Sequence, residues 1–277
     1  MLGTALAALG IVLLLAPVAA DAVGSWRARQ SAEQATDAAA AIDERERDEL
    51  LEQARAYNEQ LAGQDIDTDV LPYDEQLASS ADGVMATLRI AAIGLELPVY
   101  HGTDDATLAA GCGHVETSSL PVGGTSSNCV LAGHSGALSG RMFEDLRELA
   151  AGDIVELDVL GQTLYYRVES LAVVAEDDTQ ALQVQEGRDI VTLVTCTSAP
   201  NALMPYGGIG VNDMRLVVVA VRCEGDEAAT EGSGLYISGR ARALLAAAAA
   251  TGCLCCGRRI HTGLRSRGLK RKRGQHT

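Results

Sequence analysis

Two short runs of β-branched residues, 190–196 and 215–221, constrain the fold of this chain more than any other feature. Both are rich in Val, Ile and Thr, and clusters of Gly, Pro, Asn and Asp flank them, which is typical of β-strands. When consecutive strands pair antiparallel, the end of the first lies beside the start of the second. We therefore expect Cys196, which ends the first run, to lie beside Arg215, which begins the second.

A thiol and a guanidinium need a proton-handling partner before they can form a nucleophilic site. The chain has five histidines: His101, His114, His134, His261 and His276. The last two belong to a basic tail, and the first two lie in turn-like sequence, where turn or packing roles are expected. His134 ends a strand-like run between Gly133 and Gly136, so it can lie at an open rim. We predict that His134 is the partner of Cys196.

The three residue types suit nucleophilic acyl transfer. A thiol with a pKa of about 8.5 is only about 3% ionised at pH 7, so Cys196 needs its proton removed or its thiolate stabilised. His134 can take that proton and later protonate a departing amine. Arg215 is always charged and cannot act as a base, so its fitting role is to hold the oxyanion. The alternative for Cys196 is a buried strand cysteine.

Strand-like segments recur at short intervals after residue 83, as in an all-β barrel or sandwich. The candidate strands are 84–93, 97–100, 129–133, 154–160, 163–174, 190–196 and 216–221. Gly161 and Gln162 form a predicted hairpin turn, and residues 105–110 and 142–149 fit short helices. The sequence therefore predicts one mainly β domain.

The N-terminal region predicts a different environment. Residues 2–20 carry no charge, and about 20 apolar residues are needed to cross a bilayer. An uncleaved anchor is favoured, while a signal peptide cleaved within 16–22 and a buried core helix are the alternatives. Residues 27–61 contain no Gly or Pro and are rich in Ala, Glu, Gln and Arg, which predicts a solvated helical stalk rather than a coiled coil.

The C-terminal region carries a second apolar run and a basic tail. Residues 243–257 are uncharged, and eight basic residues follow without an acidic one, as expected for a cytoplasmic tail after a membrane segment. A disordered tail after a modest helix is the alternative. The chain has a net charge of −15 and only 3% aromatic residues, which argues against a nucleic-acid partner. The cysteines lack the spacing of a zinc site, so no metal or cofactor is expected, and a disulfide between Cys112 and Cys129 stays open.

With these motifs in place, the chain resembles the sortases of class C, the kind that assembles pili. The matching motifs are the nucleophile strand 192–197, the histidine turn 133–136 and the arginine strand 210–216, within a resemblance that covers about 80–222. The resemblance implies an eight-stranded β-barrel with Cys196 as nucleophile, His134 as general acid and base, and Arg215 as stabiliser of the substrate carbonyl and oxyanion. It also implies cleavage of an LPxTG-like sorting signal through a thioester, which a pilin lysine resolves.

Several positions depart from the class C pattern. Ser135 replaces the usual basic residue after the histidine, Asp213 and Met214 replace the usual pair before the arginine, and 198–204 lengthens the loop beside the nucleophile. Class C sortases carry a lid over the active site, with an Asp-Pro-aromatic motif whose acid faces the arginine. Here the lid residues are expected to be Pro72, the ring Tyr73, and Asp69 or Asp74 as a displaced acid, although a plain acidic linker is an equal alternative.

These inferences give an organisation in chain order. It comprises an anchor or signal segment (1–25), a helical stalk (26–62), a linker and lid (63–82), a sortase barrel (83–224), a linker with a second membrane segment (225–257) and a basic cytoplasmic tail (258–277). We expect a membrane enzyme of a Gram-positive cell with its catalytic domain outside and with pilin or surface proteins as partners. A wall-anchoring sortase or thiol protease, and a non-catalytic β-barrel binding module, are the alternatives.

Overall fold

The computed structural model describes residues 2–64, 69–78, 83–135, 142–197 and 214–225. The predicted second membrane segment and the basic tail fall almost entirely outside this range. So does the loop between the nucleophile and arginine strands. Within the residues that the structure describes, none of the helices combines the length and the apolar content that crossing a bilayer requires. The anchor at 1–25 stays a prediction from the sequence.

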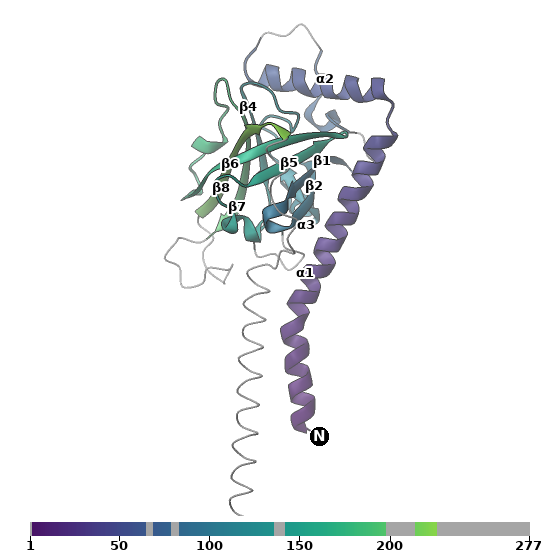
Figure 1. Ribbon diagram of the computed structural model, residues 1–277, viewed down its shortest axis with the longest axis vertical. Coiled ribbons are helices and arrows are strands. Elements are labelled where there is room, and N and C mark those ends of the chain that lie inside the picture. The colour runs from purple at the N-terminus through teal and green to yellow at the C-terminus, as the bar shows by residue number, and fades with distance from the viewer. Residues whose placement is uncertain (1, 65–68, 79–82, 136–141, 198–213, 226–277) are drawn as a thin grey trace, which may run out of the picture. The chain divides into compact units, whose positions relative to one another are not determined.

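The described chain forms a closed barrel of eight strands, as predicted (Figure 1). The strands are β1 Val84–Ile90, β2 Leu95–His101, β3 Cys112–His114, β4 Ser127–Ala132, β5 Ile154–Val159, β6 Gln162–Ala175, β7 Asp189–Thr197 and β8 Met214–Cys223. Their order around the barrel is β1-β2-β3-β4-β7-β8-β6-β5. The runs 190–196 and 215–221, which lie in β7 and β8, are therefore neighbours in the barrel.

The direction of three strands decides where the functional residues lie. β4 runs parallel to β7, with Ala132 opposite Val194, so both strands end at the same edge of the barrel. β8 runs antiparallel to β7, so β8 begins at that edge. The ends of β4 and β7 and the start of β8 therefore come together.

Alternate residues of each strand fill the barrel, because successive side chains point to opposite faces of a sheet. On β4 and β7 the inward residues include Leu131 and Leu193, both completely buried in the hydrophobic core. Tyr166 of β6 is the largest fully buried side chain and helps to fill the interior. A sequence of short β-branched strands with inward apolar residues closes in this way without an exposed edge.

Three α-helices and four 3₁₀ turns complete the described chain. They are α1 Leu2–Ala41, α2 Glu44–Leu61, α3 Asp105–Ala110, η1 Tyr73–Glu75, η2 Ala91–Ile93, η3 Glu144–Glu148 and η4 Gln180–Leu182. α1 contacts β1 and β2 (Figure 1). The predicted helix at 105–110 has these bounds, whereas the one predicted at 142–149 is a 3₁₀ turn.

The predicted continuous, solvated stalk differs from the structure in two respects. The helix is interrupted before Glu44, where the side chain of Asp43 accepts a hydrogen bond from the backbone N–H of Arg45 and caps a new helix. α2 also buries Leu51 and Ala54 against the core. Its apolar residues are few, and this is why the sequence indicated a solvated face rather than a packed one.

Two smaller differences concern β-structure. β3 was missed, because a strand of three residues with a central Gly looks like a turn. The β5–β6 hairpin turn is formed by Leu160 and Gly161 rather than by Gly161 and Gln162. Both turn residues have positive φ angles, 51° and 80°, as a two-residue hairpin of this kind requires.

Candidate active site

Cys196 and Arg215 occupy opposed positions in the ladder between β7 and β8. Opposed residues project from the same face of a sheet. Because Leu193 points into the core, Cys196, three positions later, projects from the outer face. The thiol is free and Cys196 is partly exposed, while the side chain of Arg215 is 22% exposed. The predicted pairing of these two residues is confirmed.

His134 lies in a turn that β7 holds through hydrogen bonds. The N–H of Gly133 donates to the carbonyl of Val194 at 3.2 Å, which extends the β4–β7 ladder by one residue. In the other direction, the buried hydroxyl of Thr195 donates to the carbonyl of Gly133 at 2.6 Å. The backbone before His134 is therefore fixed to the two residues that precede the nucleophile.

The residue after the histidine is also tied to the nucleophile strand. The hydroxyl of Ser135 donates to the carbonyl oxygen of Cys196 at 2.6 Å. The sequence identified Ser135 only as a departure from the class C pattern. The structure gives this serine a local role, which is to link the histidine turn to the backbone of the nucleophile.

Phe143 packs against the same turn and explains its glycine. The N–H of Phe143 donates to the carbonyl of His134 at 2.9 Å. A Cβ atom at Gly133 would lie 2.8 Å from the Phe143 ring, which is closer than real contacts allow. Only glycine therefore lets the ring approach the backbone that carries His134.

Arg215 has an acidic partner that the sequence reasoning missed. Its Nη2 atom forms an ion pair with Oε1 of Glu176, and its Nη1 atom donates to the carbonyl of Met214 at 3.2 Å. Glu176 follows the last residue of β6, at the start of an acidic run. That run was visible in the sequence, but no pattern linked it to Arg215.

The predicted lid residue Tyr73 lies on a different face of the barrel wall from Cys196. The Tyr73 ring stacks on His114 at 5.6 Å between centroids and meets His101 edge-on at 5.2 Å. His114 is opposed to the inward residue Leu131, so these contacts lie on the inner side of the sheet. The ring contacts described for Tyr73 are with these two histidines and with Tyr57, and its role as the ring of a lid stays a prediction.

The other predicted lid residues are exposed. Pro72 precedes the 3₁₀ turn η1, and Asp69 is exposed on the chain before it. Among the described residues, Glu176 is an acid that pairs with Arg215. A lid role for Asp69 and Pro72 stays a prediction.

The cluster around Tyr73 explains two of the remaining histidines. Burial lowers the pKa of His114 to about 4, against a smaller upward effect of its hydrogen bond to the Ser119 carbonyl. Burial likewise raises the pKa of Tyr73 to about 12. The Tyr73 hydroxyl lies 2.9 Å from Nδ1 of His114, and Nε2 of His101 lies 2.8 Å from the carbonyl of Gln76. Both histidines are thus engaged in packing contacts, as expected.

The other described cysteines are free thiols. Cys112 and Cys129 are buried, and burial raises the pKa of both, so they are poor nucleophiles. The disulfide between them that the sequence left open does not form here. Within the described ranges no three His, Cys, Asp or Glu side chains are grouped to hold a metal ion.

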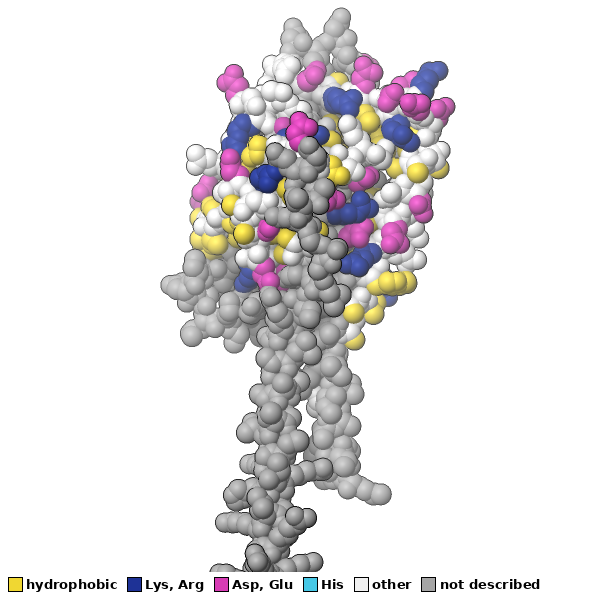
Figure 2. Space-filling view, in the orientation of Figure 1, with side chains coloured by type: hydrophobic (Ala, Val, Ile, Leu, Met, Phe, Trp, Pro, Cys, Tyr) yellow, Lys and Arg dark blue, Asp and Glu magenta, His cyan; other side chains and the backbone are white. Residues whose placement is uncertain are grey.

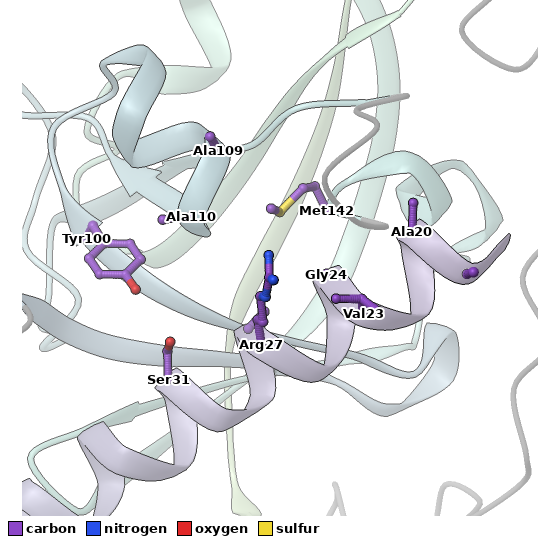
Figure 3. Close-up of a pocket in the computed structure, with 11 residues that line it drawn as sticks. Ala20, Val23, Gly24, Arg27, Ser31, Tyr100, Ala109, Ala110 and Met142 are labelled. Carbon is purple, nitrogen blue, oxygen red and sulfur yellow. The ribbon is translucent and has the colours of Figure 1, made fainter. Parts of the chain in front are cut away.

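A cavity of about 590 Å³ lies between α1 and the barrel, and none of the three predicted residues lines it (Figure 3). Small residues of α1, among them Ala20 and Gly24, form one wall, and Tyr100, Ala110 and Met142 form the other. The Arg27 side chain reaches toward Met142 in this view. On the face seen in Figure 2, acidic and basic side chains of the described residues are interspersed.

Comparison with known proteins agrees with this geometry. The sortase domain family matches residues 88–223. Sortase C1 from Streptococcus agalactiae is 34% identical, with a TM-score of 0.62, and covers 71% of this chain and 100% of its own. Sortase C from Clostridium perfringens, solved with the C-terminal cell wall sorting motif, is 30% identical, with a TM-score of 0.60 and the same coverage.

A curated relative extends the comparison beyond class C. Sortase A from Bacillus anthracis is 30% identical over 123 residues, which is 44% of this chain but only 57% of the relative. The barrel from residue 88 onward and the pairing of Cys196 with Arg215 fall within the matched region. On these grounds the chain belongs to the sortase family, and the solved structures it resembles include class C sortases.

Proposed function

We propose that this protein is a cysteine transpeptidase in which Cys196 attacks a peptide carbonyl. The observation that carries the proposal is the opposed pairing of Cys196 and Arg215 on the outer face, beside the His134 turn that β7 holds. A reactive thiol, a proton carrier and a fixed cation at one edge suit nucleophilic acyl transfer. A binding module has no need of this combination.

The reaction proceeds in two halves. His134 removes the thiol proton, and the sulfur of Cys196 bonds to the carbonyl carbon, which leaves an oxyanion that Arg215 stabilises. The C–N bond then breaks, and His134 returns the proton to the departing amine, leaving a thioester. An acceptor amine attacks that thioester and gives its proton to His134, and the C–S bond breaks to restore the thiol.

The proposed donor is a protein with an LPxTG-like sorting signal, and the proposed acceptor is a lysine amine of a pilin. The support is the class C character of the similar structures, one of which contains a sorting motif. Wall anchoring is the alternative, since the motif in that similar structure is a cell wall sorting motif. The two differ in the amine that resolves the thioester.

We place the enzyme at the cell membrane, attached through 1–25 with its barrel outside the cell. The support comes from the sequence alone, namely the uncharged run 2–20. Membrane fractionation of the full chain and of a chain lacking 1–25 tests this part separately. Recovery of the full chain in the soluble fraction would contradict it.

The catalytic proposal is tested with a peptide that contains an LPxTG motif. Intact mass spectrometry of the full chain should detect the acyl-enzyme, and peptide mapping should locate it on Cys196. C196A should abolish the adduct, and H134A should slow its formation by about 10²-fold or more. C223A is the matched control, because Cys223 is another partly exposed strand cysteine, and it should leave the adduct unchanged.

Acceptor choice is then measured by adding amines to the trapped thioester. A blocked lysine that offers only its side-chain amine should release the peptide as an amide faster than a glycine peptide does. The reverse order would favour wall anchoring, and release by water alone would indicate a thiol protease. An adduct that persists in C196A would reject the proposed nucleophile.

A further inference from the structure

The guanidinium of Arg215 is held from two directions by described atoms. Nη2 pairs with Oε1 of Glu176, and Nη1 donates to the carbonyl of Met214 at 3.2 Å. The Arg215 side chain is 22% exposed and that of Glu176 is 65% exposed. We propose that Glu176 is a positioning residue that fixes the Arg215 guanidinium beside Cys196 for the acyl-transfer step.

The place of Glu176 is set by the register of the sheet. β6 pairs antiparallel with β8 up to Val174 opposite Arg215 and Ala175 opposite Met214. Glu176 is the first residue beyond this ladder, so its backbone leaves the sheet at the point where β8 begins. The pairing of β6 with β8 therefore places the Glu176 carboxylate beside Arg215.

The chemistry of arginine gives this contact a consequence. A guanidinium is planar and carries five N–H donors in a fixed fork, at the end of a long side chain with many rotamers. Contacts at Nη1 and Nη2 fix the plane of that fork. Stabilising an oxyanion requires donors that are oriented before the reaction, and a restrained Arg215 meets this requirement better than a mobile one.

A masking role for Glu176 would have the opposite effect on the acylation rate. A carboxylate next to Arg215 lowers the positive potential that a substrate carbonyl meets, so a pure masking role would slow the enzyme. Removal of Glu176 would then accelerate acylation. A positioning role predicts slower acylation, so the sign of the change decides between the two.

The same strand offers a matched control. Glu169 of β6 forms an ion pair with Nη2 of Arg188 at 2.6 Å, and its side chain is 55% exposed. Arg188 lies just before the start of β7, eight residues before Cys196 and at the other end of that strand. E169A therefore removes a comparable exposed ion pair without touching the arginine at the site.

The inference rests on the proposed role of Arg215, so the experiment includes R215A. Thioester formation with the LPxTG peptide is followed in single turnovers by the full-length wild type, E176A, E176Q, E169A and R215A. We expect E176A to lower the maximal acylation rate about 10-fold, with little change in the peptide concentration that gives half of that rate. This is the pattern for an interaction made only in the transition state. E176Q keeps an acceptor oxygen and should recover part of the rate, and E169A should match the wild type.

The outcomes separate two failures. If R215A acylates as fast as the wild type, the proposed role of Arg215 is wrong and the inference falls with it. If R215A is inactive but E176A acylates at the wild-type rate or faster, only the positioning role of Glu176 is overturned. Equal losses in E176A and E169A would also overturn it, because they would reflect the general loss of an ion pair.

Discussion

Cys196 and Arg215 face each other directly across β7 and β8, so the nucleophile and the cation share one face of the barrel wall. This relationship follows from strand register, which the backbone hydrogen bonds of both strands maintain. The pairing is present although 198–204, Asp213 and Met214 depart from the class C pattern.

The first prediction concerns the cation. R215A should lower the rate of thioester formation by about 10²-fold to 10³-fold, the usual effect of removing one oxyanion donor. R215K keeps the charge but loses the planar fork, so it should recover only part of the rate. Single-turnover acylation measures both. R188A, which removes an arginine paired with Glu169, is the control, and an R215A rate within threefold of wild type would refute the assignment.

The second prediction concerns the glycine before His134. G133A places a Cβ atom 2.8 Å from the Phe143 ring and should destabilise the protein by about 1–3 kcal/mol through overpacking. Because the displaced backbone carries His134, acylation should slow as well. Denaturant unfolding and acylation rates measure the two effects.

A smaller side chain at residue 143 supplies the control for this prediction. F143L alone should cost stability, since Phe143 is completely buried. The double variant G133A/F143L should lose less stability than the sum of the losses measured for G133A and F143L, because the smaller side chain removes the clash. Strict additivity would mean that the ring is not what requires glycine at 133.

The pairing and the barrel could be predicted because they depend on local pattern. Short β-branched runs indicate strands, and Cys196 and Arg215 stand at strand ends, where antiparallel pairing brings residues together. Glu176 could not be predicted as a partner of Arg215, because the β6–β8 register joins residues 39 apart and leaves no trace in the sequence. β3 was missed because three residues carry too little periodicity to identify a strand.

The position of Tyr73 could not be predicted for a related reason. A Pro-aromatic pair in an acidic linker matches a lid in composition. The position of the aromatic ring, however, depends on which side chains it packs against. The buried His114 offers a ring to stack on and a nitrogen within hydrogen-bonding distance of the hydroxyl. This packing partner, distant in sequence, determines where the ring lies.

The third prediction tests that position. Y73F removes the hydroxyl that contacts Nδ1 of His114 and accepts from the N–H of Gly102, and it should cost about 1–3 kcal/mol of stability. The rate of thiol alkylation at Cys196 should stay at the wild-type value, also in Y73A, because the ring lies on the other face. Y57F is the control for stability, since its 3.4 Å contact is exposed. Faster alkylation in Y73A would support the lid interpretation.

The fourth prediction concerns the attachment of α2. Asn58 donates to the carbonyl of Leu120 at 3.1 Å and accepts from its N–H at 2.7 Å, and both bonds are buried. N58A should cost about 2–4 kcal/mol, because it leaves a buried donor and acceptor unpaired. N58D should cost more, since a carboxylate cannot donate to that carbonyl. E59A, at an exposed neighbour on the same helix, should stay within about 0.5 kcal/mol of wild type in urea unfolding.

The fifth prediction concerns acid stability and follows from the buried His114. Its pKa is about 4 in the folded protein, against an ordinary value of 6.5. Between these two pH values the histidine is protonated in the unfolded chain but neutral in the folded protein. The free energy of unfolding therefore decreases as the pH falls from 6.5 toward 4. At the lower end of this range the histidine lowers the free energy of unfolding by about 3 kcal/mol, since each pKa unit of difference is worth about 1.4 kcal/mol.

Urea unfolding of the full chain at pH 7, 6, 5 and 4.5 measures that dependence. H114Q lacks the titrating group, so it should be less stable than wild type at pH 7 but should lose less stability on acidification. The neutral ring donates from Nε2 to the Ser119 carbonyl and accepts at Nδ1 from Tyr73, and protonation would put an uncompensated charge inside the barrel wall. A slope in H114Q equal to that of wild type would show that other groups set the acid limit.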